Sequence, residues 1–245
     1  MRRFGSLINA FQKADGPPPQ ELWPFFGWAL KGSLPVLAIA AAISATAGAL
    51  EVLTAIILGR AIDAALSVGP DAVFSENAWF FIAALIFFLI ARPIVFGVSS
   101  AANSVVVGPN IMPLVLTRLH RWTLGQAVTF FDNDFAGRIS QKQMQTARAL
   151  TDVVIETVNV VFFALATLIG ATFLLTTIDW RIGLALAIWL GCYFLTIRYF
   201  LPRILVRSKA RANARAMVTG QIVETITNIK TVKLFAHDDH EESAA

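Results

Sequence analysis

The sequence predicts an all-α membrane protein, a helical bundle with four spans and long cytoplasmic helix extensions. Hydrophobic residues make up 56% of the 245 residues and charged residues only 15%, whereas soluble domains carry about 25% charged residues. Four apolar runs reach the roughly 20 residues that a helix needs to cross a bilayer. Lys and Arg are concentrated in alternate connections between these runs, which is typical of multi-pass membrane proteins.

Four spans are expected at about residues 34–58, 78–107, 153–177 and 182–201. These runs are long and do not alternate between apolar and polar residues, which indicates helices rather than the strands of a membrane barrel. A cleavable signal would place a short apolar stretch soon after the basic start Arg2-Arg3. The first run begins only near Leu34 and is longer than a signal, so we expect it to be a retained span.

Residues 1–31 are expected to form a cytoplasmic leader and an elbow helix on the membrane surface. Prolines at positions 17–19 end a leader that we expect to be disordered. The aromatic residues that follow suit the interface between lipid and water: Trp23, Phe25, Phe26 and Trp28. Residues 32–245 are expected to form the membrane domain.

The basic residues predict the orientation of the chain. The leader holds four Lys and Arg residues, and the connection between the second and third spans holds five. The loop 59–77 holds only Arg60, and the hairpin between the third and fourth spans holds only Arg181. Since Lys and Arg mark cytoplasmic loops, we expect both ends of this chain in the cytoplasm and the spans in a cell (inner or plasma) membrane.

The connections differ in length between the two sides. The outer turn Ile178–Arg181 is a tight hairpin, whereas the inner loops, about 108–152 and 202–245, continue helical patterns. If residues 78–126 form one helix, it is about 73 Å long, with kinks expected at Gly108-Pro109 and Pro113. Helices that extend beyond the lipid only on the inner side predict mechanical contact with a cytoplasmic partner.

The tip of the first inner hairpin has an unusual composition. Phe130 and Phe131 are adjacent there, and Asp132 or Asp134 could accept backbone N–H groups at a helix start. Gly137 is expected to permit the turn into the third helix. Exposed aromatic residues suit docking into a partner's groove, but the two rings could equally pack on their own helices, and the spacing leaves both interpretations open.

Charged residues inside the spans are few, and Arg92 is the most notable. It lies about 21 Å along the second helix from Ala78, and an intramembrane Arg normally faces a cavity or a partner. One hypothesis places it on a translocation path for anionic or amphipathic cargo. The other, slightly favoured, is structural: Arg92 snorkels inward or caps carbonyls freed by Pro93. Glu51 is expected near the outer interface.

Several functional classes are disfavoured. The basic residues flank apolar runs, so they indicate membrane topology rather than nucleic-acid binding. The single cysteine, Cys192, excludes a disulfide within the chain, and three histidines outside the spans do not suggest a metal or haem site. No pair of His, Cys or carboxylate residues has catalytic spacing within the spans, so we expect no catalytic, cofactor-binding or metal-binding residues in this chain.

The tip motif nevertheless has a likeness to a known family. Phe130-Phe131-Asp132, followed after four residues by Gly137-Arg138-Ile139, resembles the first intracellular loop of ABC exporters. Four further features agree in order and spacing: the aromatic elbow at Trp23–Trp28, the outer Asp179-Trp180-Arg181, the long fourth helix and the stretch Glu224–Phe235. The resemblance covers nearly the whole chain, whereas each motif by itself is weak.

This resemblance implies the first four spans of the transmembrane domain of a type I/type IV, multidrug-type ATP-binding/permease exporter. Two helices would then couple the spans to a nucleotide-binding domain. The first contact would include Phe130, Phe131, Asp132, Gly137 and Arg138, and the second would include Phe235, Ala236, His237 and Asp238. Residue chemistry alone favours a solvated helix surface for His237.

The resemblance also implies partners: membrane lipid, an ABC nucleotide-binding domain and a second transporter half, with homodimer and heterodimer both open. The sequence has no Gly-x-x-x-x-Gly-Lys-Ser/Thr phosphate loop. ATP and Mg are therefore expected in a nucleotide-binding domain absent from this chain, and the full-length protein would be an ATP-hydrolysing translocase. Truncation is the preferred explanation. The alternative is a self-contained four-span membrane sensor or scaffold.

Overall fold

The computed structural model describes residues 7–68, 73–132 and 136–227. The regular structure in these ranges is helical, and the chain divides into two compact units, Met1–Ile178 and Asp179–Ala245. Four helices within the described ranges are long and apolar enough to cross a membrane: Leu34–Ser67, Ala78–Leu124, Ile139–Ile178 and Trp180–Arg211. The predicted all-α class with four apolar helices is confirmed.

The elbow helix α1 covers Leu22–Leu30, as its aromatic composition predicts. Gly32 then turns the chain with a φ of +88°, a left-handed conformation that glycine adopts without strain. The first long helix, α2, covers Leu34–Val68 and is about 52 Å long at 1.5 Å per residue.

The end of α2 corrects the expected outer loop. Residues 59–68 are helical, because alanines and leucines with high helix propensity continue the pattern beyond Leu58. The loop expected at 59–77 is therefore wrong for its first half. The sequence predicted that helices extend beyond the lipid only on the inner side, as parts of the second to fourth helices. α2 is also longer than a membrane crossing needs, because it exceeds the roughly 30 Å of a hydrocarbon core.

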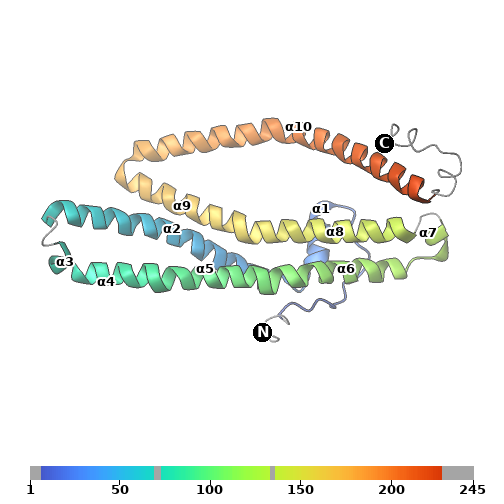
Figure 1. The fold of residues 1–245 in the computed structure, drawn as a ribbon, viewed down its shortest axis with the longest axis horizontal. Coiled ribbons are helices and arrows are strands. Elements are labelled where there is room, and N and C mark those ends of the chain that lie inside the picture. The colour runs from blue at the N-terminus through green and yellow to red at the C-terminus, as the bar shows by residue number, and fades with distance from the viewer. Residues whose placement is uncertain (1–6, 69–72, 133–135, 228–245) are drawn as a thin grey trace. The chain divides into compact units, whose positions relative to one another are not determined.

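The second long helix is continuous from Ala78 to Leu124, after the short helix α3 (Val73–Glu76) (Figure 1). It consists of α4 (Ala78–Ile86), the π-helical segment η1 (Phe87–Ala91), α5 (Arg92–Ala101), the π-helical segment η2 (Ala102–Val107) and α6 (Gly108–Leu124). With 47 residues it is about 70 Å long, so the prediction of one long helix is confirmed.

Each of these π-helical segments ends next to a proline. The Arg92 N–H bonds to the Phe87 carbonyl and the Gly108 N–H to the Asn103 carbonyl, five residues back in each case. Pro93 and Pro109 follow directly, and a proline ring collides with the carbonyl four residues before it in a regular α-helix. The wider π turn accommodates that ring, so the helix continues through both prolines.

The chain returns through a second continuous helix after α7 (Val128–Asp132). This helix consists of α8 (Ala136–Glu156), the π-helical segment η3 (Thr157–Val161) and α9 (Phe162–Ile178). Figure 1 shows α2, the α4–α6 helix and the α8–α9 helix running side by side within the first unit.

Small residues allow α2 and α9 to pack closely. A Cβ atom added at Gly48 would lie 2.3 Å from the Phe163 carbonyl oxygen, and one at Gly170 would lie 2.8 Å from a Val52 methyl carbon. The Thr167 hydroxyl donates to the Gly48 carbonyl at 3.0 Å. Such close approach of backbones is how helices associate in lipid, where apolar side chains alone provide no driving force.

The hydrophobic core of the first unit lies where the leader and α1 meet α6 and α8. The most deeply buried side chains there include Ile111, Leu114 and Val115 of α6, and Ala147 and Leu150 of α8. The spacing of these residues, three and four apart, is typical of the buried face of an amphipathic helix. The core therefore joins α6 and α8 to the elbow helix α1.

The leader belongs to this core, which corrects the expected disorder for the part that the structure describes. Ile8 is buried in the core cluster. The Thr117 hydroxyl donates to the Ala10 carbonyl at 2.8 Å, and Arg121 donates to the Phe11 carbonyl at 2.7 Å. The segment is fixed by α6 through its backbone, so its own polar composition did not reveal its order.

The second unit contains α10, which covers Trp180–Thr227 and continues through Pro202. Asp179 precedes it, and its side chain accepts the Arg181 N–H at 2.8 Å, an N-terminal cap. Arg203 donates to the Tyr199 carbonyl and its guanidinium lies 3.6 Å from the centre of the Tyr199 ring. The expected continuation of the fourth helix beyond Pro202 is confirmed as far as Thr227.

Candidate functional site: a hairpin tip and an intramembrane ion pair

The hairpin tip is formed by the end of α6, the short helix α7 and the start of α8. Gly125 and Gln126 close the end of α6, with N–H groups bonded to the Trp122 and Thr123 carbonyls. The Phe130 N–H then bonds to the Ala127 carbonyl and starts α7. α7 is thus a helical turn separate from α6.

The two adjacent phenylalanines of α7 have different environments. The Phe130 ring is half-buried and lies edge-to-face with Trp122 of α6, at a centroid distance of 6.5 Å. Phe131 is 38% exposed and contacts Phe130 at 5.3 Å. Of the two interpretations that the spacing left open, packing on the chain's own helix applies to Phe130. Docking of the exposed Phe131 into a partner stays a prediction.

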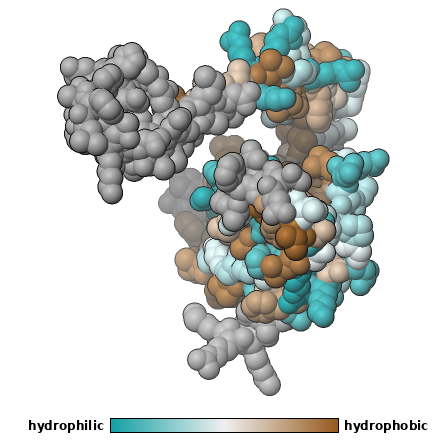
Figure 2. Space-filling model, turned by 90° about the vertical axis from the view of Figure 1, so that its right-hand side faces the viewer, coloured by the Kyte–Doolittle hydropathy of each residue, from teal (hydrophilic) through white to brown (hydrophobic). Residues whose placement is uncertain are grey.

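The surface around the tip is mixed in polarity. Figure 2 views this end of the molecule and shows hydrophobic residues among hydrophilic ones. Leu124 and Val128 are exposed there together with Phe131.

The two helices that lead to the tip, α6 and α8, are called the stalks here, and they are bonded to each other. The Gln143 amide of α8 donates to the Thr123 hydroxyl of α6 at 2.8 Å. Further up, the buried residues of α6 and α8 form the core described above. Both helices continue through their π-helical segments into the apolar parts of the chain.

The remaining predicted coupling residues are placed as follows. Asp132 is the last residue of α7, and Gly137 and Arg138 lie in the first turn of α8. Gly137 is therefore inside a helix, and the expectation that it forms the turn is wrong, since α8 already begins at Ala136. Phe235, Ala236, His237 and Asp238 lie outside the described residues, as does Asp134.

Arg92 forms an ion pair with Glu51 across α5 and α2. The Arg92 Nη2 and Glu51 Oε1 atoms are 2.8 Å apart, with side chains 35% and 31% exposed. The Arg92 guanidinium also lies 5.5 Å from the centre of the Phe96 ring. Glu51 lies 17 residues from each end of α2 (34–51–68), and its expected position near the outer interface stays a prediction. The apolar run that ended near Leu58 concealed the true length of the helix.

Arg118 holds the leader and the end of α1 together. From the sequence alone it was interpreted only as one of the basic residues that mark the cytoplasmic side. It is 2% exposed and donates to four backbone carbonyls: Gln12 at 3.1 Å, Trp28 and Ala29 at 2.8 Å, and Lys31 at 2.7 Å. These carbonyls belong to the leader and to the end of α1. A signal was present, because Arg118 follows Ile111, Leu114 and Val115 at helical spacing on the buried face of α6.

An exposed ion pair fixes the same region from outside. Lys31 Nζ and Asp15 Oδ2 are 2.8 Å apart, and both side chains are largely exposed. The hydrogen bond from Lys31, and then its positive charge, lower the pKa of Asp15 from its ordinary value. The pair therefore links the leader to the end of α1 at neutral pH.

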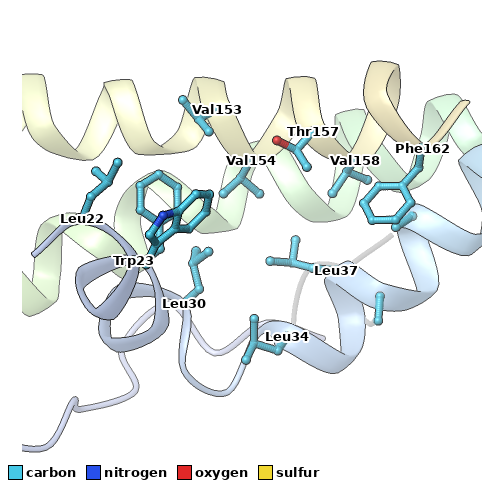
Figure 3. Close-up of a pocket in the computed structure, with 13 residues that line it drawn as sticks. Leu22, Trp23, Leu30, Leu34, Leu37, Val153, Val154, Thr157, Val158 and Phe162 are labelled. Atoms are coloured by element: carbon cyan, nitrogen blue, oxygen red, sulfur yellow. The ribbon is translucent and has the colours of Figure 1, made fainter. Parts of the chain in front are cut away.

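Two of the cavities in the described part of the first unit differ in polarity. One, of about 700 Å³, is almost wholly apolar and lies between α1, the start of α2 and the α8–η3 junction, where Trp23, Leu37 and Val158 line it (Figure 3). The other, of about 350 Å³, is lined in part by serine and asparagine side chains of α5, η2 and η3.

Comparison with protein families decides the identity of this architecture. Residues 37–244 match the family model described as the ABC transporter transmembrane region. The chain belongs to the ABC transporter family. The resemblance drawn from the tip motif and the elbow is thereby confirmed, and the chain is a multi-pass transmembrane part of an ABC transporter.

Two curated ABC transporter relatives are longer than this chain. An uncharacterized ABC transporter ATP-binding protein of Haemophilus influenzae is 28% identical over 247 residues, which cover 99% of this chain and 39% of the relative. A putative multidrug export ATP-binding/permease protein YgaD of Bacillus subtilis is 22% identical over 117 residues, which cover 48% of this chain and 20% of the relative. No solved structure matches the chain significantly.

Proposed function

We propose that this transmembrane region forms part of the translocation path of an ATP-driven exporter and receives its driving motion through α7. The observation that carries this proposal is the exposed Phe131 ring at the end of a helical hairpin whose stalks are packed together and continue into the spans. An apolar anchor on a stiff lever suits a docking contact with a moving partner.

The packing of the long helices on one another supports a mechanical link between α7 and the spanning helices. The α8–α9 helix packs against α2 through close backbone contact at Gly48, and α6 packs against α8. Packed interfaces of this kind shift as rigid elements rather than deform continuously. Closure of a cytoplasmic partner on α7 would therefore tilt α5 and α9 together, which is the motion that alternating access requires.

The partner in this proposal is an ABC nucleotide-binding domain that carries ATP and Mg. Both relatives are named as ATP-binding proteins, and this chain spans 39% or less of their length. Residues of this chain do not fit ATP themselves: the sequence lacks a phosphate loop, and the described residues contain no strand from which a strand–loop–helix nucleotide site could be built. ATP hydrolysis would belong to the remainder of the full-length protein.

The complete transporter would need a second half, either identical or related, to enclose the path. The basic residues of the leader and inner loops favour a cytoplasmic location for both ends, with the spans in the cell membrane. The second contact with the nucleotide-binding domain would involve Phe235, Ala236, His237 and Asp238, by resemblance alone. The family assignment favours this transport module over a self-contained sensor or scaffold.

The ion pair between Arg92 and Glu51 changes the expected role of Arg92. A guanidinium neutralised by a carboxylate at 2.8 Å no longer presents a free positive charge to anionic cargo. We therefore propose that Arg92 lines the path as half of a neutral pair that joins α5 to α2. This corresponds to the structural hypothesis, with Glu51 rather than freed carbonyls as the partner.

Crosslinking tests the docking contact. Phe131→Cys, in a full-length protein otherwise free of cysteine, is expected to crosslink to the nucleotide-binding domain with a short bifunctional reagent. Met144→Cys is the matched control, because it lies on α8 away from the tip and is similarly exposed, at 44% against 38%. Absence of a crosslink at Phe131 in protein that transports would refute the coupling role.

Substitutions at the two phenylalanines separate coupling from stability. Phe131→Ala is expected to lower the transport rate and the dependence of that rate on ATP. The unfolding temperature is expected to stay close to native, because the Phe131 ring is exposed. Phe130→Ala is expected to lower the unfolding temperature, because it removes a half-buried ring that packs on Trp122. Equal effects of both substitutions on stability would contradict the assignment of different environments.

A further inference from the structure

We propose that a groove between α6 and α8 binds the phosphate-bearing headgroup of an anionic membrane lipid. This stalk groove has a volume of about 330 Å³ and is lined by residues of the two stalks. It is separate from the tip helix α7 and from the ion pair of Arg92 and Glu51, so the proposal goes beyond the transport function. It rests only on the cytoplasmic location proposed above for the stalks.

The first step concerns the depth of the stalk groove relative to the membrane. The aromatic composition of the elbow helix α1 suits the interface between lipid and water. Arg118 of α6 fixes the end of α1 by donating to the Trp28 and Ala29 carbonyls at 2.8 Å. The α6 residues that line the groove lie between positions 116 and 121, within one turn of Arg118. Since a turn rises 5.4 Å and each headgroup layer is roughly 5–8 Å thick, the groove lies at the depth of the lipid phosphates.

The second step concerns charge. His120 and Arg121 line the groove and are exposed, and the lining residues include no carboxylate. The sequences of both stalks, 108–124 and 136–151, contain no Asp or Glu at all. Their Lys and Arg residues are Arg118, Arg121, Arg138, Lys142 and Arg148. Basic pockets between helices on the cytoplasmic side of a membrane bind anionic headgroups, and here no negative charge of the stalks opposes such a ligand.

The third step concerns the hydrogen-bond donors at the groove. The Arg121 Nη1 atom donates to the Phe11 carbonyl at 2.7 Å, which fixes the guanidinium beside the groove. A guanidinium carries five N–H donors, so this bond leaves donors for a phosphate, which arginine binds with particular geometric fit. On the opposite wall, Ser140 of α8 lines the groove and is exposed. Donors for phosphate oxygens are therefore present on both stalks.

The fourth step favours a lipid over a soluble phosphate. Leu116 of α6 and Met144 of α8 line the same groove, and Met144 is 44% exposed. Inorganic phosphate would leave these apolar side chains in water, whereas the glycerol and the first methylene groups of a lipid would cover them. Because burial of apolar surface is favourable, an amphiphilic anion fits the lining better than a purely polar one.

Photolabelling of the full-length protein in phosphatidylcholine nanodiscs tests the proposal. The probes are phosphatidylglycerol and phosphatidylcholine with a diazirine at the same acyl position near the glycerol, so that the two lipids differ in net charge. In native protein, phosphatidylglycerol is expected to label peptides that contain residues 116–121 and 140–144 about fivefold more than phosphatidylcholine, the effect of one charge near a lipid surface. Inorganic phosphate at millimolar concentration is expected not to compete.

Two matched pairs of variants separate the groove from the general positive field of the stalks. Ser140→Glu and Gln141→Glu both add a carboxylate at an exposed position of α8, but only Ser140 lines the groove, because successive helix residues point about 100° apart. Ser140→Glu is expected to lower phosphatidylglycerol labelling about fivefold, and Gln141→Glu to leave it within about twofold of native. Arg121→Gln is expected to lower it more than Arg148→Gln, since Arg148 is exposed on α8 but is not among the lining residues.

Three outcomes overturn the proposal. Equal labelling by the two lipids in native protein, a comparison that needs no substitution, would show that the groove selects no anionic headgroup. Equal effects of Ser140→Glu and Gln141→Glu would show that only the general field of the basic stalks acts. Displacement of the label by inorganic phosphate would assign the groove to a soluble anion. None of these measurements uses ATP or transport, so this result and the Phe131 crosslink can fail independently of each other.

Discussion

Replacement of Arg118 provides the sharpest test of how the leader and the elbow are held. Arg118→Leu leaves a shorter, apolar side chain and removes the donors to four carbonyls, those of Gln12, Trp28, Ala29 and Lys31. Trp28 and Ala29 lie in the last turn of α1, where carbonyls have no partner within the helix. Arg118 therefore acts as a cap for α1 from another element.

The magnitude follows from the burial of these groups. A hydrogen bond to a charged donor contributes about 1.5–3 kcal/mol, and such bonds on one guanidinium are not additive. Each buried carbonyl that is left without a donor costs about 1–3 kcal/mol, and no charge remains unpaired because the guanidinium itself is removed. We expect the docking of residues 7–31 on α6 to weaken by about 3–5 kcal/mol, which is about two to four powers of ten in its equilibrium constant.

Hydrogen exchange of the protein in nanodiscs, read by mass spectrometry, measures this effect. Amides of the leader and α1 are expected to exchange faster in Arg118→Leu, while those of α9 stay protected. Arg118→Lys should be intermediate, since an ammonium keeps the charge but cannot span four carbonyls in the plane of a guanidinium. Arg121→Leu is the matched control, because Arg121 bonds only the Phe11 carbonyl at an exposed site. Native-like exchange in Arg118→Leu, or an equal effect in Arg121→Leu, would refute the reasoning.

Three further predictions follow from single contacts. Glu51→Gln should lower the unfolding free energy by about 1–3 kcal/mol, because it leaves the Arg92 charge unpaired in a spanning segment, and adding Arg92→Gln should recover part of the loss in thermal unfolding of the detergent-solubilised protein. Gly48→Ala should cost about 1–3 kcal/mol by overpacking, since its Cβ would meet a backbone carbonyl at 2.3 Å, whereas Gly59→Ala, with open space around its Cβ, should be neutral or slightly stabilising. Asp15→Asn should slightly lower the unfolding temperature at pH 7. Because the native pKa of Asp15 is lowered, this difference should shrink as the pH falls through that lowered pKa and vanish below it. A difference that persists once Asp15 is protonated in the native protein would contradict this prediction.

The tip of the hairpin shows how far sequence reasoning reaches and where it ends. The motif Phe130-Phe131-Asp132 predicted a special tip, and α7 is found there. Sequence spacing could not assign the two rings, since adjacent residues of a short helical turn have the same local context. Their roles depend on Trp122, which the tertiary structure brings to Phe130 and not to Phe131.

The spans illustrate the same division. Apolar length predicted four membrane-crossing helices, because the cost of unsatisfied backbone groups in lipid leaves few alternatives. The length of α2 was underestimated, because helix propensity continues where hydrophobicity falls. The lack of a hydrogen-bond partner for the buried Asn103 Oδ1 atom among the described residues could not be predicted either. Whether a polar group is paired depends on the neighbouring helices.

By itself, the sequence determined that the chain is helical, spans a membrane four times and has the motif order of an ABC transporter. These properties depend on composition, periodicity and local spacing, which the chain carries wherever its elements lie. Only the tertiary structure decided that Glu51 neutralises Arg92, that Arg118 holds the elbow, and that the buried Asn103 Oδ1 atom has no hydrogen-bond partner among the described residues. The physical reason is that each of these depends on partners 41 or more residues away in the chain, or on their absence, and local patterns contain no information on such distant pairing.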